Sequence, residues 1–381
     1  MGDPVEIDSE HKWADQREMF DDLREQCPVA RANGDMMILR HADVVAAATD
    51  PETFSSAVSA RRVIPNGLNG PEHAAYRAIV DSYLTSEQVA EQEPQCRQVA
   101  TAIIAGLPRG RMVKTITDVG VPYAVRTMSA WLGWPAAMEA DLVQWMADNH
   151  AATRSGDRSR TAAVAERFDA MIHALLDARR EGPATDVTGE LMREQVSGRT
   201  LVDAEVVSIL RNFTAGDLGS LATSAGVIVH YLARHPEIQR WLREQMATAT
   251  QAEVEDALNE ILRIDDPFVS NRRRVTQDVD VSGTALPADS RVLLNWTSAN
   301  RDPRTFDDPD EYDPAGNAGA NLVFGIGPHV CPAKGLTLME LRVLIEVLLE
   351  QTTWIELDAH EPAVREIPPV GGWARVPVVL H

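Results

Sequence analysis

Residues 324–335 read FGIGPHVCPAKG and are followed at once by a long apolar segment. Gly325 and Gly327 let the backbone turn tightly with positive φ, which brings its NH groups near the sulfur of Cys331. Pro332 lacks an NH and suits the first position of a helix. Cys331 would then lie at a helix N-terminus, where free NH groups and the dipole favour a thiolate. Such a thiolate suits an axial ligand to haem iron, although a buried cysteine at a helix start is also common.

The composition argues against several classes of protein. With 36 basic and 57 acidic residues the net charge is −21, and both nucleic acid and anionic membranes require a basic surface on their partners. The three cysteines are odd in number and lack CxxC spacing, so neither a disulfide framework nor a zinc site is expected. Residues 1–16 are polar and acidic, and no later segment resembles a membrane span. We therefore expect a soluble, cytoplasmic protein with no nucleic acid or membrane partner.

The hydrophobic pattern predicts a mainly α protein with a small β portion. Helices are expected at 13–31, 74–84 and 88–104, and they dominate from there to about residue 263. The stretch 204–233 has no proline and is apolar along most of its length. As one helix it would be about 45 Å long and would cross the centre of the molecule.

Strands are expected where this pattern changes. A short strand precedes a helix within 36–54, and 272–296 alternates apolar and polar residues around a Ser-Gly turn. The last helix is expected at 332–351. No linker, repeat or low-complexity tract marks a boundary. We expect one domain over 1–381, helix-rich at 70–265 and 332–351 and β-rich near 36–40, 272–296 and 352–381.

The loop around Cys331 resembles the haem-binding loop of the cytochrome P450 superfamily, whose pattern is F-G-x-G-x-H/R-x-C-x-G/A. Six positions agree at fixed spacing: Phe324, Gly325, Gly327, His329, Cys331 and Ala333. The resemblance implies that family's fold, a helical triangular prism with a long central helix over haem b, and a monooxygenase activity. It also implies that Cys331 is the proximal metal ligand, that Phe324 packs near it and that His329 faces a haem propionate.

Other segments extend the resemblance over almost the whole chain. Glu260 and Arg263, in LNEILRID, match the Glu-x-x-Arg pair that locks the family's core beside the haem loop. His73 and Arg77 match its His-x-x-x-Arg helix, and Arg273 matches an arginine that follows the Glu-x-x-Arg helix; these three are implied to bind propionates. Taken singly, each would be an ordinary surface charge. Buried carboxylates of haem, however, need charged or hydrogen-bonding partners.

The expected central helix departs from the family pattern A-G-x-[D/E]-T-T, in which an acid and an alcohol deliver protons. The chain reads TAGDLGS, so Leu218 occupies the acid position and Gly219 that of the first threonine. The nearest acid and alcohol are each displaced by one residue, about 100° of rotation on a helix. The candidate catalytic residues are Gly216, Asp217, Gly219 and Ser220.

Three interpretations of this departure stay open. We favour a monooxygenase in which a water, Asp217, Ser220 or a substrate hydroxyl relays protons. Alternatively, the enzyme takes hydrogen peroxide directly, or it carries out another oxidation such as phenolic coupling. A glycine at 219 that only makes room for substrate fits all three. A second departure is Gly316, which stands where the family often has an arginine that completes a triad with the Glu-x-x-Arg pair, so the third member is missing or replaced.

The substrate loop is expected at 57–70, where Arg61 and Arg62 would meet either solvent or an acidic group of the substrate. The pocket should be apolar, and we expect hydroxylation or O-dealkylation of a small apolar molecule, aromatic or terpenoid in size. The expected substrate contacts are Ile64, Phe213, Ala215, Phe268 and Val269.

Electron supply is expected from a separate ferredoxin and its reductase, since the chain has no flavin or iron–sulfur motif. A basic patch around Lys334, with Arg109 and Arg111 as neighbours, would receive an acidic ferredoxin. Two non-oxygenase alternatives also stay open: a haem sensor or carrier, and a catalytically idle domain that recruits a partner.

Overall fold

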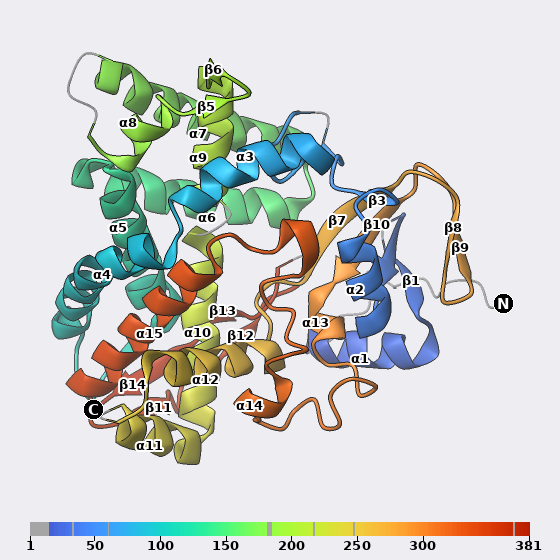
Figure 1. Ribbon diagram of the computed structural model, residues 1–381. Coiled ribbons are helices and arrows are strands. Elements are labelled where there is room, and N and C mark those ends of the chain that lie inside the picture. Colours follow the sequence, from blue (N-terminus) through green and yellow to red (C-terminus); the bar gives the residue numbers. More distant parts are fainter. Residues whose placement is uncertain are drawn as a thin grey trace.

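The computed structural model describes residues 15–32, 34–59, 61–180, 185–215, 218–246, 248–368 and 370–381. Helices form one side of the molecule, and a five-stranded sheet with α1 and α2 forms the other (Figure 1). The helices are α1 (Gln16–Gln26), α2 (His41–Thr49), α3 (Gly70–Ser82), α4 (Ser86–Gly106), η1 (Thr115–Gly120), α5 (Val121–Leu132), η2 (Ala136–Met138), α6 (Glu139–Ser155), α7 (Arg158–Arg180), α8 (Val187–Leu191), α9 (Asp203–Ala215), α10 (Leu218–Arg234), α11 (Pro236–Gln245), α12 (Gln251–Ile264), α13 (Trp296–Ala299), α14 (Pro314–Asn317), η3 (Gly327–His329) and α15 (Lys334–Gln351).

The strands are short and lie mostly in the first and last thirds of the chain. They are β1 (Val29–Ala32), β2 (Asp35–Ile38), β3 (Phe54–Ser55), β4 (Met112–Lys114), β5 (Gln195–Val196), β6 (Arg199–Thr200), β7 (Ser270–Val275), β8 (Val279–Val281), β9 (Thr284–Leu286), β10 (Arg291–Asn295), β11 (Ile355–Leu357), β12 (Val364–Arg365), β13 (Trp373–Arg375) and β14 (Pro377–Leu380). The expected fold class, mainly α with a small β portion, is confirmed.

The five-stranded sheet has the order β1-β2-β10-β7-β3, and β2 and β10 form its parallel pair. Side chains alternate between its faces. Met36 and Ile38 of β2 pack in a core cluster with Val44 of α2, whereas Met37 packs in a second cluster with Phe20 of α1. The sheet is therefore covered by one helix on each face.

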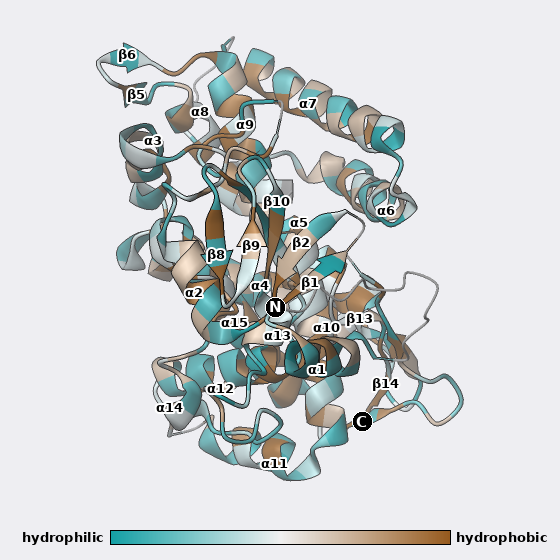
Figure 2. Ribbon diagram, turned by 90° about the vertical axis from the view of Figure 1, so that its right-hand side faces the viewer, coloured by the Kyte–Doolittle hydropathy of each residue, from teal (hydrophilic) through white to brown (hydrophobic). Residues whose placement is uncertain are grey.

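The largest core cluster lies among the helices and includes the buried residues of α10. Two glycines let α10 approach η1 closely. A Cβ on Gly120 would lie 2.7 Å from the carbonyl oxygen of Ala222, and a Cβ on Gly226 would lie 2.6 Å from Ile116 Cγ1. At the edge of the molecule, α7 alternates hydrophilic and hydrophobic residues, as an amphipathic helix does (Figure 2).

Most expected elements are present with shifted ends. The helix expected at 13–31 is wrong beyond Gln26, where α1 ends and β1 follows. The cause is Pro28, because the residue before a proline disfavours the helical region, and Cys27 is extended with φ −153° and ψ 148°. The helix expected at 74–84 begins earlier, at Gly70, with Pro71 in its first turn.

The final helix also begins later than expected. It starts at Lys334, whose NH lies 3.4 Å from the carbonyl oxygen of Cys331, so Pro332 belongs to a turn rather than to the helix. The stretch 204–233 is helical on both sides of residues 216 and 217, which lie outside the described residues. In the part of the chain that the structure describes, no helix has the length and apolarity needed to cross a membrane.

We expect Gly120→Ala to lower the free energy of unfolding by about 1–3 kcal/mol, because the new Cβ would meet backbone atoms that cannot rotate away. Denaturant unfolding followed by circular dichroism measures the change. Gly106→Ala is the matched control, since no atom lies within 4 Å of its Cβ position at the exposed end of α4. Equal losses in the two variants would contradict this account of the α10–η1 contact.

Candidate functional site

Cys331 ends a loop whose shape depends on glycine. Its backbone NH donates to the carbonyl oxygen of Phe324 at 2.9 Å, which closes the loop. Gly325 and Gly327 have φ values of 70° and 79°, as the sequence predicts. A Cβ on Gly327 would also lie 2.8 Å from the carbonyl oxygen of Ala48 in α2. The partly exposed cysteine is thus held in a tight turn against α2.

Two histidines stack beside this loop. The rings of His73, from α3, and His329 lie 4.2 Å apart between centroids, and Nε2 of His329 lies 3.0 Å from Oγ of Ser56. Burial lowers the pKa of His329 to about 3, and the charges of His73, Arg273 and Arg77 act in the same direction. Burial, and then Arg77, also lower the pKa of His73. The surroundings of these two histidines therefore disfavour protonation of either ring.

Two arginines complete a basic cluster with these histidines. Arg77 donates to the carbonyl oxygens of Pro328 and Val330 in the loop, at 3.2 and 2.8 Å, and pairs with Asp81. Arg273 is 6% exposed, and burial lowers its pKa to about 10. Its guanidinium donates to the carbonyl oxygen of its neighbour Arg272. Within the described ranges, no carboxylate lies within 4 Å of Arg273.

This basic cluster, formed by His73, Arg77, Arg273 and His329, fits the carboxylates of a haem. A buried guanidinium without a carboxylate is unfavourable, and an anion placed there would reverse the depression of the pKa of His329. Cys331 and His329 lie in one loop, and the other members of the basic cluster come from α3 and β7. The residues present therefore fit the group that the sequence predicts.

The proton-relay candidates on the central helix are only partly described. Gly216 and Asp217 lie outside the described residues, as does the side chain of Ala215. In α10, Leu218 is buried and 1% exposed, whereas Gly219 and Ser220 are partly exposed. The side chain that lies against Gly219 is His150 of α6, which the sequence did not point to.

The Glu-x-x-Arg pair is wholly buried. Arg263 and Glu260 are 0% and 2% exposed and form two hydrogen bonds of 2.8 Å. Arg263 also donates to the carbonyl oxygens of Asn300, Pro309 and Glu311 at 2.8, 3.1 and 3.2 Å. A single turn of α12 thus fixes the irregular segment that leads to the cysteine loop.

The third member of the expected triad with Glu260 and Arg263 is replaced rather than missing. Asn317 donates from Nδ2 to Oε1 of Glu260 at 2.7 Å. At Gly316, where the family often has arginine, any Cβ would lie 2.0 Å from Oδ2 of Asp313, the carboxylate that caps α14. The neutral amide one residue later takes the arginine's place. The sequence contained no signal for this, because the contact depends on how α14 lies against α12.

The expected substrate loop is anchored to α9 and α7. The NH of Ile64 donates to Oγ of Ser208 at 2.8 Å, and Asn212 donates to the carbonyl oxygen of Ile64. Arg61 lies 3.4 Å from Glu166 of α7. Arg62 pairs with Glu72 of α3 and lies 3.7 Å from Glu205 of α9. Both loop arginines are therefore engaged by the protein's own carboxylates.

The other predicted substrate contacts fall in different surroundings. Phe213 is 6% exposed and packs edge-on against Trp131, with ring centroids 5.0 Å apart. Val269 is 4% exposed and packs in the core cluster beside α1. Phe268 is 43% exposed.

The basic patch expected around Lys334 is wrong in part, because Arg109 and Arg111 do not lie beside Lys334. Lys334 begins α15 and lies 5.9 Å from the ring centroid of Phe324, beside the loop. Arg109 instead donates to the carbonyl oxygen of Gln351, the last residue of α15. The two ends of this helix lie about 27 Å apart, so Arg109 and its neighbour Arg111 belong to another part of the surface. Ala333 precedes α15 and accepts from Thr337 NH at 2.8 Å.

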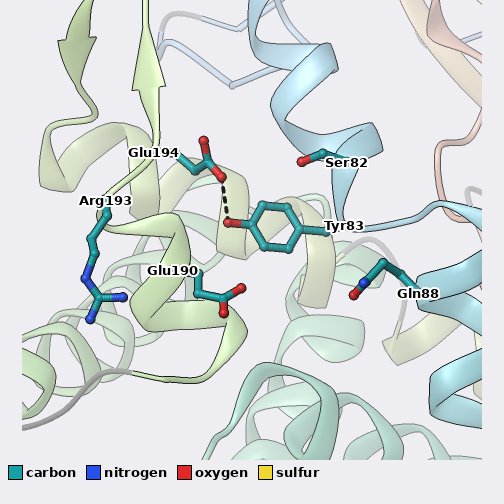
Figure 3. Close-up of a pocket in the computed structure, with 6 residues that line it drawn as sticks. All are labelled: Ser82, Tyr83, Gln88, Glu190, Arg193 and Glu194. Carbon is teal, nitrogen blue, oxygen red and sulfur yellow. Dashed lines mark hydrogen bonds between the residues drawn. The ribbon is translucent and has the colours of Figure 1, made fainter.

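A surface pocket of about 410 Å³ lies elsewhere, where α3 and α4 meet α8 (Figure 3). Tyr83 projects into it and donates to Glu194 at 3.0 Å. Its lining is mostly polar and contains none of the residues predicted to bind haem or substrate. The lining residues are Ser82, Tyr83, Gln88, Glu190, Arg193 and Glu194.

Comparison with known proteins agrees with this geometry. Residues 126–370 match the sequence profile described as cytochrome P450. The erythromycin C-12 hydroxylase of Saccharopolyspora erythraea is 29% identical over 94% of this chain and 93% of its own length. Linalool 8-monooxygenase of Pseudomonas putida is 25% identical over 89% of each chain.

Solved structures give the same result. A mutant of the cytochrome P450 EryK in complex with erythromycin B superimposes with a TM-score of 0.86 over 96% of both chains, at 26% identity. The expected fold is therefore confirmed over nearly the whole length.

We expect Asn317→Ala to lower the free energy of unfolding by about 1.5–3 kcal/mol, because it removes a hydrogen bond to a buried carboxylate. Asn317→Asp should cost more, since it sets a second carboxylate beside Glu260. Denaturant midpoints measure both effects. Asn66→Ala is the control: it removes a bond of 2.8 Å to Asn212 between exposed neutral amides and should change stability by no more than about 0.5 kcal/mol. Similar midpoints for the Asn317→Ala and Asn66→Ala variants would exclude a structural role for Asn317.

Proposed function

The chain belongs to the cytochrome P450 family, and from that membership we propose that it hydroxylates or O-dealkylates a small apolar molecule with electrons from a separate ferredoxin. As a P450 it is a monooxygenase that uses haem b. The observation that carries the proposal is the loop of Cys331 beside a buried basic cluster in which Arg273 pairs with no carboxylate of the residues that the structure describes.

In this proposal Cys331 is the thiolate ligand, and the basic cluster takes the two propionates. Haem, when bound, supplies the iron centre at which dioxygen is reduced. Arg273 and His73 would donate to propionate oxygens in a site of low dielectric, where charge-assisted bonds are strong. Arg77 would act on the loop as well as on a propionate, because it already holds the carbonyls of Pro328 and Val330.

The state of the substrate loop supports an apolar, uncharged substrate. Arg61 and Arg62 are the basic residues of the loop, and protein carboxylates engage both. An acidic substrate would have to displace those contacts. The named relatives act on compounds as different as erythromycin and linalool, so we base the substrate class on this loop and not on those names. Of the predicted basic patch, Lys334 remains beside the cysteine loop as a contact for ferredoxin.

A second candidate, peroxide-driven oxidation, is favoured by one observation. Leu218 is buried and Gly219 has no side chain, so neither offers the acid or the alcohol that the family uses. Parallel turnover with NADH, ferredoxin and its reductase, and with hydrogen peroxide alone, distinguishes the two. Turnover with ferredoxin at the higher rate supports the first proposal, and turnover with peroxide only replaces it with the second.

We expect Cys331→Ala to abolish the carbon-monoxide difference band of a thiolate-ligated haem. Optical spectra of the reduced, carbon-monoxide-treated protein measure this. Cys27→Ala is the control, because Cys27 is half-buried at the end of α1, where its sulfur contacts the carbonyl oxygen of Leu23 at 3.6 Å. Survival of the band in the Cys331→Ala protein would show that the sulfur of Cys331 is not the ligand.

We expect Arg273→Ala to speed loss of haem by about 10- to 150-fold, the equivalent of a charge-assisted hydrogen bond of about 1.5–3 kcal/mol. Transfer of haem to an excess of apomyoglobin measures the rate. Arg274→Ala is the matched control one residue along β7, since Arg274 is 51% exposed and pairs with Asp289. Equal rates in the two variants would remove Arg273 from the propionate site.

A further inference from the structure

The start of α10 is partly exposed, unlike the stretch of the helix that follows it. Residues 221–229 of this helix are all buried, whereas Gly219 and Ser220 just before them are partly exposed. Gly219 itself contributes no side chain at this partly exposed point.

The side chain that lies against Gly219 is His150 of α6. A Cβ at position 219 would lie 3.1 Å from Nε2 of His150 and 3.8 Å from its Cε1. This is closer than an ordinary van der Waals contact between such atoms. The imidazole therefore packs directly against the position at which a side chain at 219 would begin.

His150 brings a titratable side chain to this place. Leu218 and Gly219 have no exchangeable side-chain proton, and an imidazole is the side chain best suited to move protons near neutral pH. Its Nε2, the atom closest to Gly219, is the atom that would hold the proton. Ser220 is the other candidate within the described part of the helix, and its hydroxyl lies one residue further round.

Charged neighbours of His150 lead away from α10 toward the surface. Arg154, one turn later on α6, is 37% exposed at its side chain and pairs with Glu366, which follows β12 and is 6% exposed. Burial lowers the pKa of His150, Arg154 acts in the same direction and Glu366 opposes them. His150 itself is partly exposed. It can therefore lose a proton toward α10 and regain one from water.

We propose that His150 supplies at Gly219 the proton-donating group that the central helix lacks. The proposal deepens the proposed function and rests on it. In the overall reaction a C–H bond and the O–O bond of dioxygen break, one oxygen atom enters the substrate as a hydroxyl, and the other leaves as water. Two electrons come from ferredoxin and two protons from solvent. His150 passes such protons from Nε2 to the oxygen that leaves as water, and then takes up others from bulk water.

The first test uses the reduced holoprotein with carbon monoxide as the probe and needs no substrate. The C–O stretching frequency responds to hydrogen-bond donors and charge on the open side of haem. We expect this frequency to fall as pH is lowered through the pKa of His150, which burial holds below the ordinary value of a histidine. His150→Phe should abolish the pH dependence. His173→Phe, at an exposed position on α7, is the matched control and should retain it.

A pH dependence that persists in the His150→Phe protein overturns the proposal, as does one that Ser220→Ala removes and His150→Phe does not. His150→Gln repeats the test with a polar side chain should the phenylalanine protein fail to fold. A variant that retains the thiolate band with carbon monoxide is folded and has the proposed ligand. Absence of that band in the unmodified protein would instead sink the proposed function.

The second test follows oxygen reduction with NADH, a ferredoxin and its reductase, without added substrate. Each dioxygen becomes either peroxide, with two electrons, or two waters, with four. We expect His150→Ala to raise the peroxide fraction at least threefold, and Gly219→Thr in that background, where no ring crowds position 219, to lower it again by restoring an alcohol. An unchanged fraction overturns the proposal. A raised fraction that Gly219→Thr fails to lower also overturns it, because His150 would then act through packing alone.

Discussion

The buried ion pair between Glu260 and Arg263 constrains the rest of the site. Two charges can be removed from water only where their remaining polar atoms also find partners, and here those partners lie outside α12. Arg263 takes three carbonyl oxygens from the segment 300–311, and Glu260 takes the amide of Asn317. The same segment continues into the cysteine loop, since the side chain of Asn300 accepts from the NH of Leu322 at 2.7 Å. One helical turn thus orders the irregular chain of residues 300–331 that ends at the candidate ligand.

The basic cluster differs from this ion pair, because its buried arginine is not paired with a carboxylate of the described residues. Around Arg263 the protein supplies its own carboxylate, whereas within the described residues Arg273 has none within reach, although the chain carries 57 acidic residues. Burial depresses the pKa values of Arg273 and His329 and so opposes their charged forms. The protein without cofactor therefore buries the guanidinium of Arg273 with no carboxylate partner among the described residues, and carboxylates that enter with the haem would supply one. Binding of the cofactor and stability of this region are coupled for that reason.

Local pattern in the sequence predicted the fold class and the glycine conformations at 325 and 327, and the family resemblance implied the meeting of the histidines and arginines beside Cys331. The sequence did not predict features that arise between distant segments. Asn317 reaches Glu260 because α14 packs on α12, and Arg109 lies far from Lys334 because it binds the opposite end of α15. The helix ends shifted where proline restricts the residue before it, or where a turn precedes the first helical bond.

The departure on the central helix has a related explanation. A catalytic pattern written along one helix counts only the side chains of that helix, yet a pocket is lined by several elements. The absence of a side chain at Gly219 leaves the space that the imidazole of His150 enters, and a Cβ at 219 would lie only 3.1 Å from its Nε2. A side chain at 219 would therefore require the ring of His150 to shift. Loss of the alcohol from α10 is thus not in itself loss of the proton supply, because the same substitution admits a proton-holding group from α6.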